Sequence, residues 1–446
     1  MKRIVVKPAV RPLRGALKVP GDKSIAHRAL LLAGMSDGVS RLRGLPPGLD
    51  VAATRRAMES LGVEITGEGD SGILVRGRGL NGLAAPSGPI DCGNSATTAR
   101  LLAGVVAGRG FSVKLAGDET LSVRPMERIA VPLSRMNARV SGRTTSSRTT
   151  LPLIVGGDEP LLGAHHRLSM ASAQVKSCLL LAGLRARGET AVTEPRVSRN
   201  HTENMLRAQG VELYGHGRTV MLRGPARRLE PLDLELPGDA SSAAFMLVAA
   251  LLLTGSVVDI DGVGLNPTRL GFVDALRRMG GEIEGEVLSE CAGEAAGCLR
   301  AVGGAPLRGT DVLADETPRL LDEIPVLAVA AALARGRTRF LGCGELRYKE
   351  SDRIAVVVEM LRAFGVHVKE YSDGFDVTGT AGEPLEGGGR VESKGDHRIA
   401  MAAVVLALTA RKPTTVCDSA VIANSYPALF DALARLHDGS VVCEEG

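Results

Sequence analysis

The sequence has few aromatic residues: its 446 residues include no tryptophan, four tyrosines and seven phenylalanines. Proteins that bind single-stranded nucleic acids stack the bases on aromatic rings, so this scarcity argues against a base-stacking surface. The formal net charge of +4 is also too small to indicate nucleic-acid binding by itself. We therefore expect no nucleic-acid partner.

Cysteine is scarce as well, and its spacing follows no metal-binding pattern. The seven cysteines include no C-x-x-C pair, and the closest two, Cys291 and Cys298, have no histidine near them. An odd number of cysteines without such pairs argues against both a disulfide framework and a zinc site. We expect reduced cysteines in a cytoplasmic protein that binds no metal.

Long apolar stretches are absent too. The longest, Ala243–Leu253, has the length of a buried helix rather than of a membrane span. The basic segment Met1–Pro8 lacks the apolar core of a secretory signal and is predicted to form the first strand. We expect no membrane partner.

With 44% hydrophobic and 23% charged residues the composition is that of a globular protein, and the length of 446 residues favours two domains.

What the sequence has in abundance is repetition. Six times a small or polar residue precedes an alanine- and leucine-rich helix, and each time an amphipathic helix follows. Successive copies start about 70–80 residues apart, which indicates one supersecondary unit used repeatedly, each copy needing its neighbours to bury an apolar face. The six apolar helices are predicted to begin at Asp22, Gly93, Ser172, Gly238, Asp322 and Gly395.

Short β-branched runs bounded by glycine and proline lie between the predicted helices. Strands that alternate with helices favour an α/β fold. Asp22, Asp239 and Asp396 are suitable N-caps for three of the apolar helices, and glycines follow four of the amphipathic ones. The predicted strands are Ile4–Val6, Gly72–Val75, Ser112–Leu115, Thr190–Thr193, Thr219–Leu222, Val257–Ile260, Thr338–Leu341 and Phe375–Thr378.

The tripeptide Pro-Gly-Asp occurs twice, at residues 20–22 and 237–239, and three repeat units lie between the two copies. We predict that these segments are hinges at which the chain crosses between two domains. Residues 1–20 and 239–446 would then form a discontinuous domain with three repeat units, and residues 21–238 an inserted domain with the other three.

Polar residues at the starts of the apolar helices are the candidates for chemistry. Lys23 would lie in the first turn of a helix, where the helix dipole favours anions and opposes a cation. This placement makes sense if an external anion binds at the helix N-terminus, near Ser24 and Arg28. The alternative is a solvated lysine beside an N-cap.

The charged run at residues 347–353 is a second candidate. If the run is helical, Lys349 and Arg353 share one face, and Glu350 lies one turn from Arg353. The usual interpretation of such a run is a solvent-exposed face with salt bridges. The alternative is that these charges belong to a binding site.

The repeated position of the polar residues is more informative than any one of them. Equivalent helix ends in a repeat architecture point toward a common place. We therefore predict a cleft, ringed by helix N-termini, cations and a few carboxylates, that binds a polyanion. The residues concerned are Lys23, Asn94, Ser172, Gln174, Asp322, His397 and Arg398 in first helical turns, Arg124 and Arg199 at loop-to-helix junctions, and Asp322 with Glu323 as a helix cap.

Nine stretches, spread in order over the whole chain, resemble 5-enolpyruvylshikimate-3-phosphate (EPSP) synthases: PGDKSIAHRALLLAG, GNSATTARLLAG, RPM, SAQVKSCLLLAGL, SRNHTENML, PGDASSAAF, DEIPVLAVAA, YKESDRI and DHRIAM. The stretches SAQVKS and SRNH resemble the subgroup that is less sensitive to the herbicide glyphosate. The resemblance implies two similar domains, each of three βαβαββ units, forming an inside-out α/β barrel with the active site in the cleft between the domains.

The resemblance also implies the reaction. The enolpyruvyl group of phosphoenolpyruvate is transferred to the 5-hydroxyl of shikimate 3-phosphate, and phosphate is released by addition and elimination through a tetrahedral intermediate, in aromatic amino-acid biosynthesis. It implies no metal or organic cofactor and two small-molecule substrates. We expect the protein to be a monomer. By the resemblance, shikimate 3-phosphate is held by Lys23, Ser24, Arg28, Ser172, Ala173, Gln174, Arg199, Asp322 and Lys349, and phosphoenolpyruvate by Lys23, Asn94, Ala96, Arg124, Gln174, Arg353, His397 and Arg398.

The charges of the substrates agree with this assignment. Each carries a carboxylate and a phosphate of roughly −2 at neutral pH, so about six negative charges must be gathered. We take Glu350 as the candidate proton donor to the methylene carbon, Asp322 as the candidate base and Lys23 as a third catalytic group, and which carboxylate handles which proton stays open. The cations that the resemblance assigns are Lys23, Arg28, Arg124, Arg199, Lys349, Arg353 and Arg398.

Two residues depart from the pattern of the family. Ala96 stands where glyphosate-sensitive members have glycine, and its methyl group would intrude on ligands longer than phosphoenolpyruvate, so we expect weak inhibition by glyphosate. Asn424 stands where some members have lysine, so one cation of the usual set is absent.

Two alternative functions remain. A sister family transfers the same group to UDP-N-acetylglucosamine, but generally has a cysteine, or in some members an aspartate, in the loop where this chain has residues 117–123 with Asp118 and no cysteine. A non-catalytic repeat scaffold that binds an acidic partner would spread its charges over an exposed face, and it leaves Asp322 and Glu350 without a purpose.

Overall fold

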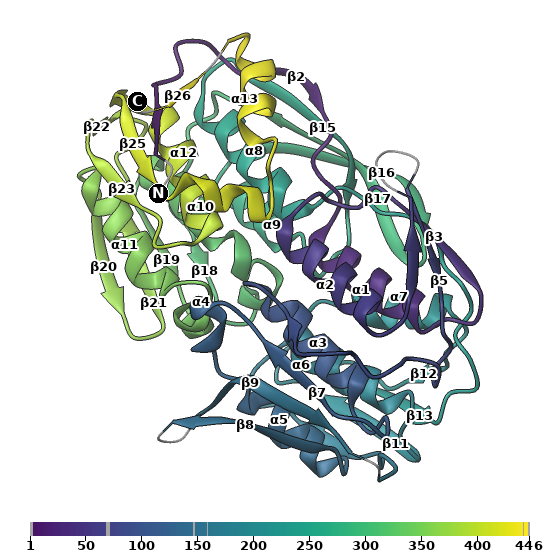
Figure 1. Cartoon of the computed structure of the whole chain (residues 1–446). Helices are drawn as coiled ribbons and strands as arrows, with labels where there is room; N and C mark the ends of the chain where they lie inside the picture. Colours follow the sequence, from purple (N-terminus) through teal and green to yellow (C-terminus); the bar gives the residue numbers. More distant parts are fainter. Residues whose placement is uncertain (1–2, 68–71, 146–147, 158, 440, 445–446) are drawn as a thin grey trace. The chain divides into compact units, whose positions relative to one another are not determined.

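The computed structural model describes residues 3–67, 72–145, 148–157, 159–439 and 441–444 (Figure 1). The chain forms two compact lobes. Lobe 1 comprises Met1–Pro20, Pro237–Ser289 and Ala295–Gly446, and lobe 2 comprises Gly21–Leu236 and Glu290–Glu294. The last segment lies outside the predicted inserted domain, residues 21–238, but contacts lobe 2: Asn204 donates a hydrogen bond to the carbonyl of Gly293 at 2.8 Å.

The described residues of lobe 2 form three four-stranded sheets, with strand orders β14-β3-β5-β4, β6-β7-β9-β8 and β10-β11-β13-β12. Its strands are β3 (Val39–Arg43), β4 (Glu64–Thr66), β5 (Ile73–Arg76), β6 (Ile90–Asp91), β7 (Val113–Ala116), β8 (Arg139–Thr145), β9 (Arg148–Gly156), β10 (His165–Arg167), β11 (Gly188–Thr193), β12 (Leu213–Tyr214), β13 (Thr219–Gly224) and β14 (Asp233–Glu235). Its helices are α1 (Lys23–Gly34), α2 (Leu49–Ser60), α3 (Ala96–Val106), α4 (Glu119–Ser122), α5 (Glu127–Arg135), α6 (Ala173–Gly183) and α7 (His201–Ala208).

In lobe 1, the part of the chain that the structure describes also forms three four-stranded sheets, ordered β16-β17-β15-β2, β18-β19-β21-β20 and β23-β25-β1-β26, with a small pair β22-β24. Its strands are β1 (Ile4–Val6), β2 (Arg14–Leu17), β15 (Val257–Gly264), β16 (Glu282–Cys291), β17 (Glu294–Val302), β18 (Asp311–Val312), β19 (Arg337–Phe340), β20 (His367–Tyr371), β21 (Gly374–Thr378), β22 (Leu385–Gly387), β23 (Arg390–Glu392), β24 (Ala410–Lys412), β25 (Thr414–Cys417) and β26 (Val442–Glu444). Its α-helices are α8 (Ala240–Leu252), α9 (Gly271–Arg278), α10 (Ile324–Leu333), α11 (Arg353–Ala363), α12 (His397–Leu408) and α13 (Leu429–His437).

One pairing pattern recurs in all six large sheets. An edge strand pairs in parallel with its neighbour, which pairs antiparallel with a third strand. In two sheets this edge strand is the last strand before the chain passes from one lobe to the other. These strands are β2, which pairs with β15 in lobe 1, and β14, which pairs with β3 in lobe 2. The expected α/β fold with repeated units is confirmed. Each sheet among the described residues is open, so no single sheet closes into a barrel by itself.

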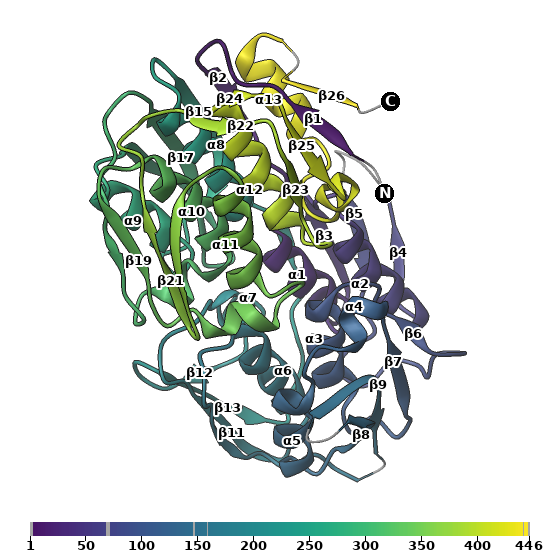
Figure 2. The same ribbon diagram turned by 90° about the vertical axis from the view of Figure 1, so that its left-hand side faces the viewer.

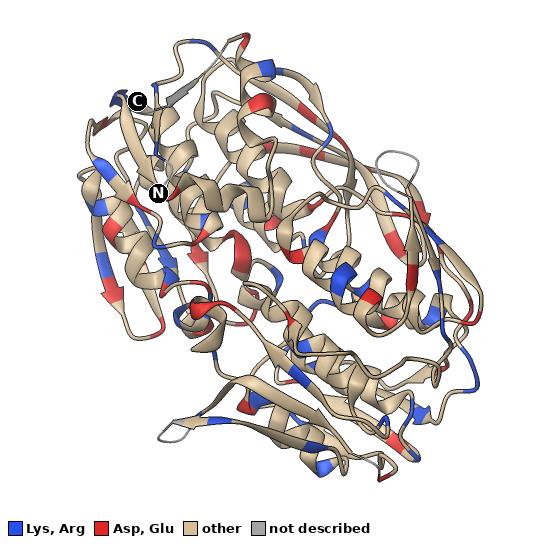
Figure 3. Cartoon of the chain, viewed as in Figure 1, with Lys and Arg blue, Asp and Glu red and all other residues tan. Residues whose placement is uncertain are grey.

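The apolar helices form the cores of both lobes. In lobe 1, α8, α10 and α12 pack against one another, and the bodies of α8 and α10 carry no charged residue (Figures 2 and 3). In lobe 2, α3 and α6 approach closely at Gly104, where an added Cβ would lie 2.1 Å from the carbonyl oxygen of Cys178. Small residues at such contacts let two helix backbones approach closely.

Five of the predicted helix ends follow the sequence signals. Asp22, Asp239 and Asp396 each accept a hydrogen bond from a backbone N–H of the first turn, which confirms them as N-caps. Gly62 and Gly210 follow α2 and α7 with φ values of +87° and +83°, a conformation that favours glycine. Within the described part of the chain, no helix is long and apolar enough to cross a membrane.

Candidate active site

The first two turns of α1 carry three candidate residues in lobe 2: Lys23, Ser24 and Arg28. Asp22 caps the helix by accepting a hydrogen bond from Ile25 N at 2.9 Å. Lys23 forms an ion pair with Asp50 of α2, and the two side chains are 17% and 10% exposed. Lys23 is thus partly buried and paired, so the alternative of a freely solvated lysine is wrong.

Arg28 lies in a network that joins α1, α6 and α7. Its guanidinium donates to Thr202 Oγ1 at 2.8 Å, to Ser177 Oγ at 3.0 Å and to the carbonyl of Ser24 at 2.8 Å. Arg199 Nη1 reaches the hydroxyl of Ser24 at 3.4 Å from the loop before α7. Burial lowers the pKa of Arg28 to about 10, so the side chain is cationic at neutral pH. Two cations and a serine are therefore gathered at one place.

The N-termini of α3 and α6 form a second hydrogen-bonded group in lobe 2. Asn94 donates to Asp118 at 2.8 Å and accepts from Arg124 Nη2 at 2.9 Å. Gln174, in the first turn of α6, donates to Thr97 Oγ1 of α3 at 2.9 Å. Ser172 caps α6, and Ala96 is the first residue of α3 and is buried.

Arg100 was missed by the sequence analysis. It is buried, and it donates to Gln174 Oε1 at 2.6 Å and to the carbonyl of Pro125 at 3.2 Å. It therefore fixes the orientation of Gln174 relative to the loop that carries Arg124. The signal that could have found it is an arginine in the middle of an otherwise apolar helix, where an unpaired charge is costly.

Arg353 is the centre of the charged group in lobe 1. It is 1% exposed, and it contacts three carboxylates: Asp396 at 2.7 Å, Glu350 at 2.5 Å and Asp322 at 3.2 Å. Burial alone would lower the pKa of Arg353, but these carboxylates raise it above the ordinary value for arginine. The expected solvent-exposed charged face is therefore wrong at this residue.

The Asp322 carboxylate contacts cations and does not cap a helix. Its carboxylate lies 3.5 Å from Lys349 Nζ and 3.8 Å from Arg398 Nη2, in addition to its contact with Arg353. Residues 321–323 form a 3₁₀ turn, and α10 begins at Ile324 without a side-chain cap. The predicted capping role of Asp322 and Glu323 is thus wrong, because both carboxylates face cations instead.

The charged run at residues 347–353 is not one helix. A 3₁₀ segment, Gly344–Tyr348, is followed by Lys349 in an extended conformation, and α11 begins only at Arg353. Asp352 caps α11 by accepting from Ala355 N at 3.1 Å. The predicted shared helical face of Lys349 and Arg353 is wrong, although both contact Asp322 through a different geometry.

The candidate residues thus gather in two groups, one in each lobe. The lobe 1 group also contains His397 and Arg398 in the first turn of α12, while Asn424 ends a 3₁₀ segment, Ser419–Asn424. The cations of this group already contact carboxylates. The comparison of substrate charges with cations in the sequence does not include these carboxylates. The carboxylates are Asp322, Glu323, Glu350 and Asp396.

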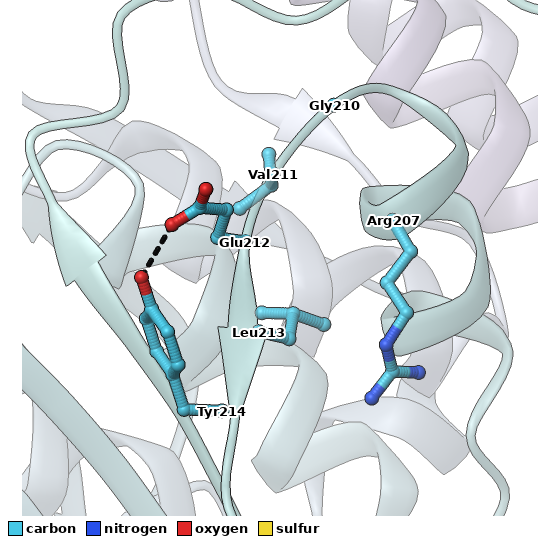
Figure 4. Close-up of a pocket in the computed structure, with 6 residues that line it drawn as sticks. All are labelled: Arg207, Gly210, Val211, Glu212, Leu213 and Tyr214. Atoms are coloured by element: carbon cyan, nitrogen blue, oxygen red, sulfur yellow. Dashed lines mark hydrogen bonds between the residues drawn. The ribbon is translucent and has the colours of Figure 1, made fainter.

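Two cavities in lobe 2 contain none of the predicted site residues. One, of about 520 Å³, is lined by Arg207, Glu212 and Tyr214, with Gly210, Val211 and Leu213, and the Tyr214 hydroxyl donates to Glu212 (Figure 4). The other, of about 250 Å³, borders Lys176, Glu194 and Glu203. Within the described residues, no group of three or more His, Cys, Asp or Glu side chains is arranged to hold a metal ion.

Comparisons with known proteins agree on one family. The family described as "EPSP synthase (3-phosphoshikimate 1-carboxyvinyltransferase)" matches residues 8–433. Curated proteins named 3-phosphoshikimate 1-carboxyvinyltransferase are similar: that of Alkalilimnicola ehrlichii is 47% identical, covering 95% of this chain and 94% of that protein, and that of Halorhodospira halophila is 46% identical, covering 96% and 94%.

Solved structures are similar as well. EPSP synthase from Acinetobacter baumannii matches with a TM-score of 0.87 and 37% identity, covering all of both chains. The enolpyruvyl transferase NikO from Streptomyces tendae matches with a TM-score of 0.79 at 19% identity, which shows a shared fold alone.

Proposed function

Because this chain belongs to the EPSP synthase family, we propose that its two groups of charged residues act on one pair of substrates. The protein is a 3-phosphoshikimate 1-carboxyvinyltransferase of aromatic amino-acid biosynthesis: it transfers the enolpyruvyl group of phosphoenolpyruvate to the 5-hydroxyl of shikimate 3-phosphate and releases phosphate. We propose the roles of the single residues.

Shikimate 3-phosphate binds chiefly to lobe 2 in this proposal. Arg28 and Arg199 supply positive charge beside Ser24, and Arg–carboxylate and Arg–phosphate pairs are strong, directional contacts. Ser172 lies at the N-terminus of α6, where the backbone N–H groups favour an anion. The full set is Lys23, Ser24, Arg28, Ser172, Ala173, Gln174 and Arg199, with Asp322 and Lys349 from lobe 1.

Phosphoenolpyruvate is held by cations of both groups. Arg124 is buried and already oriented by Asn94, and Arg353 and Arg398 are held by carboxylates, so none of the three must be ordered when the substrate binds. The full set is Lys23, Asn94, Ala96, Arg124, Gln174, Arg353, His397 and Arg398.

Glu350 and Asp322 carry the proton transfers. A proton moves from Glu350 to the methylene carbon of phosphoenolpyruvate, Asp322 takes the proton of the 5-hydroxyl, and the new carbon–oxygen bond gives the tetrahedral intermediate. The Glu350 carboxylate then takes a proton back from the methyl group as phosphate leaves, which restores the double bond, and Asp322 passes its proton to the departing phosphate. Support comes from Arg353, which contacts both carboxylates and so holds the two groups in a fixed relation. Lys23 adds positive charge near the phosphates.

Glyphosate inhibits this protein weakly in our proposal, because Ala96 is buried at the start of α3 and its methyl group takes up space beside the phosphoenolpyruvate ligands. We also propose that the protein is a monomer that acts in the cytoplasm. Sedimentation at working concentration tests the first point, and cell fractionation the second.

Identity of 47% over 95% of the chain is the observation that carries the function. The experiment is an assay of phosphate release from phosphoenolpyruvate. We expect release with shikimate 3-phosphate as acceptor and none with UDP-N-acetylglucosamine. Release with the nucleotide sugar alone would favour the sister enzyme, and no release with either would favour the non-catalytic scaffold.

A further inference from the structure

A buried carboxylate outside the proposed substrate-binding set lies between two segments of that set. Glu194 directly follows β11 and is 3% exposed. Its Oε1 accepts a hydrogen bond from the backbone N–H of Ser172 at 3.0 Å, and its Oε2 accepts from the backbone N–H of Ser198 at 3.2 Å. Ser172 begins the segment with Ala173 and Gln174, and Ser198 precedes Arg199. One side chain therefore joins both segments.

Lys176 holds Glu194 in place. Its ammonium lies 2.8 Å from Glu194 Oε2 and 2.8 Å from Glu203 Oε1, and all three side chains are at most 6% exposed. Burial alone would lower the pKa of Lys176, but the two glutamates raise it, so the lysine is charged. Lys176 is in α6 and Glu203 in α7, so the ion pairs connect three elements.

Glu203 differs from Glu194 in one respect that makes it a matched control. Its Oε1 pairs with the same lysine, but its Oε2 has no hydrogen-bond partner among the residues that the structure describes. Both glutamates are buried and share one cation. Only Glu194 also accepts hydrogen bonds from the backbones of the two substrate-binding segments.

We propose that Glu194 is a positioning residue for shikimate 3-phosphate: by accepting both backbone N–H groups, it holds the Ser172–Gln174 segment and Arg199 in a fixed relation. This inference rests on the proposed function. Without the carboxylate, two buried N–H groups lose their acceptor, and buried polar groups without partners are costly. The two segments would then move apart or reorient, and contacts with the substrate would weaken.

The sign of the effect separates positioning from simple electrostatics. Glu194 and Glu203 are negative charges near a subsite for an anion. Burial lowers the pKa of Arg28, and the charge of Glu203 partly offsets that effect. Removing either charge should, by Coulomb attraction alone, improve binding of shikimate 3-phosphate. A weaker affinity after removal of the Glu194 charge therefore has to come from lost positioning.

The test compares Glu194→Gln with Glu203→Gln. Glutamine keeps the size of the side chain, but its NH₂ group cannot accept a hydrogen bond. In Glu194→Gln this NH₂ group would therefore lie against a backbone N–H group, of Ser172 or of Ser198, that has lost its acceptor. We expect Glu194→Gln to raise the KM for shikimate 3-phosphate on the order of tenfold, while the KM for phosphoenolpyruvate stays within about twofold. For Glu203→Gln we expect the KM for shikimate 3-phosphate to be unchanged or lower.

The thermal midpoints of both variants are measured alongside the kinetics. If both lose stability to a similar degree and neither changes the KM for shikimate 3-phosphate selectively, Glu194 is merely structural and the inference is wrong. If Glu194→Gln does not fold, Glu194→Asp replaces it, because the shorter side chain keeps the charge for Lys176 but cannot reach both backbone groups. The same selective rise is expected for it, and an unchanged KM overturns the inference. Absence of phosphate release by the unmodified protein would instead contradict the proposed function.

Discussion

Asp322→Asn tests the proposed chemistry in lobe 1 most sharply. The Asp322 carboxylate lies 3.2–3.8 Å from three cations, Lys349, Arg353 and Arg398. Asparagine keeps the size of the side chain but removes its negative charge and its ability to take up a proton. The variant therefore loses the proposed base, while the three cations lose an anion that competes with the substrates.

The two consequences have different magnitudes and signs. Loss of a general base lowers kcat by about 10²–10⁴-fold, which corresponds to about 3–5 kcal/mol in the activation barrier. The KM for phosphoenolpyruvate should fall or stay unchanged, because the cations near Asp322 are then less neutralised and attract an anion more strongly. A large loss of kcat without a loss of phosphoenolpyruvate affinity is the expected pattern.

Initial rates of phosphate release, with each substrate varied in turn, give kcat and both KM values. Asp311→Asn is the matched control, because Asp311 is also a carboxylate of lobe 1 that accepts from an arginine, Arg339 Nε at 2.7 Å, but it lies outside the proposed set. The control should keep kcat within about twofold of the unmodified protein. If Asp322→Asn does the same, or raises the KM for phosphoenolpyruvate with kcat unchanged, Asp322 is not the base.

Three further predictions follow from single residues. Arg353→Met leaves the buried carboxylate of Asp396 without the cation that it contacts and should lower the free energy of unfolding by about 3–5 kcal/mol, measured by urea denaturation; a loss below about 1 kcal/mol would contradict the buried ion cluster. Ala96→Gly should lower the inhibition constant for glyphosate by about tenfold or more with little change in the KM for phosphoenolpyruvate, and unchanged inhibition would disprove the role of the methyl group. Burial, with Lys23 and Arg28 adding to it, holds the pKa of His27 well below 6.5, so the unfolded chain takes up a proton near pH 6.5 while the folded protein does not. Stability is therefore present above pH 6.5 and lost below it, and between pH 7.5 and 5.5 the unmodified protein should lose about 1.4 kcal/mol more than His27→Gln in urea denaturation; equal losses would show that His27 is protonated in the folded state.

The repeat architecture could be predicted because its signals are local. An N-cap such as Asp239 and the apolar run after it lie within one helix, so spacing and composition reveal them, and the structure shows the six expected helix pairs. The family could be recognised for the same reason, since its motifs are contiguous stretches.

The site could be predicted only as far as those motifs reach. The partners of its residues lie far apart in the sequence: Arg28 contacts Ser177, 149 residues away, and Arg353 contacts Asp396, 43 residues away. A local pattern therefore indicated a helix cap at Asp322 where the fold supplies cations from two other segments. It also gave no sign of Glu194, whose function depends on backbone groups that only the fold brings to it.

The most direct test of the central claim is a crystal structure of Asp322→Asn, which should react slowly, with shikimate 3-phosphate and phosphoenolpyruvate bound. We predict that shikimate 3-phosphate contacts Arg28 and Arg199, and that phosphoenolpyruvate contacts Arg124, Arg353 and Arg398 together. Either substrate bound away from these residues, or phosphoenolpyruvate in contact with the cations of only one lobe, would contradict the claim that both groups of charged residues serve one reaction.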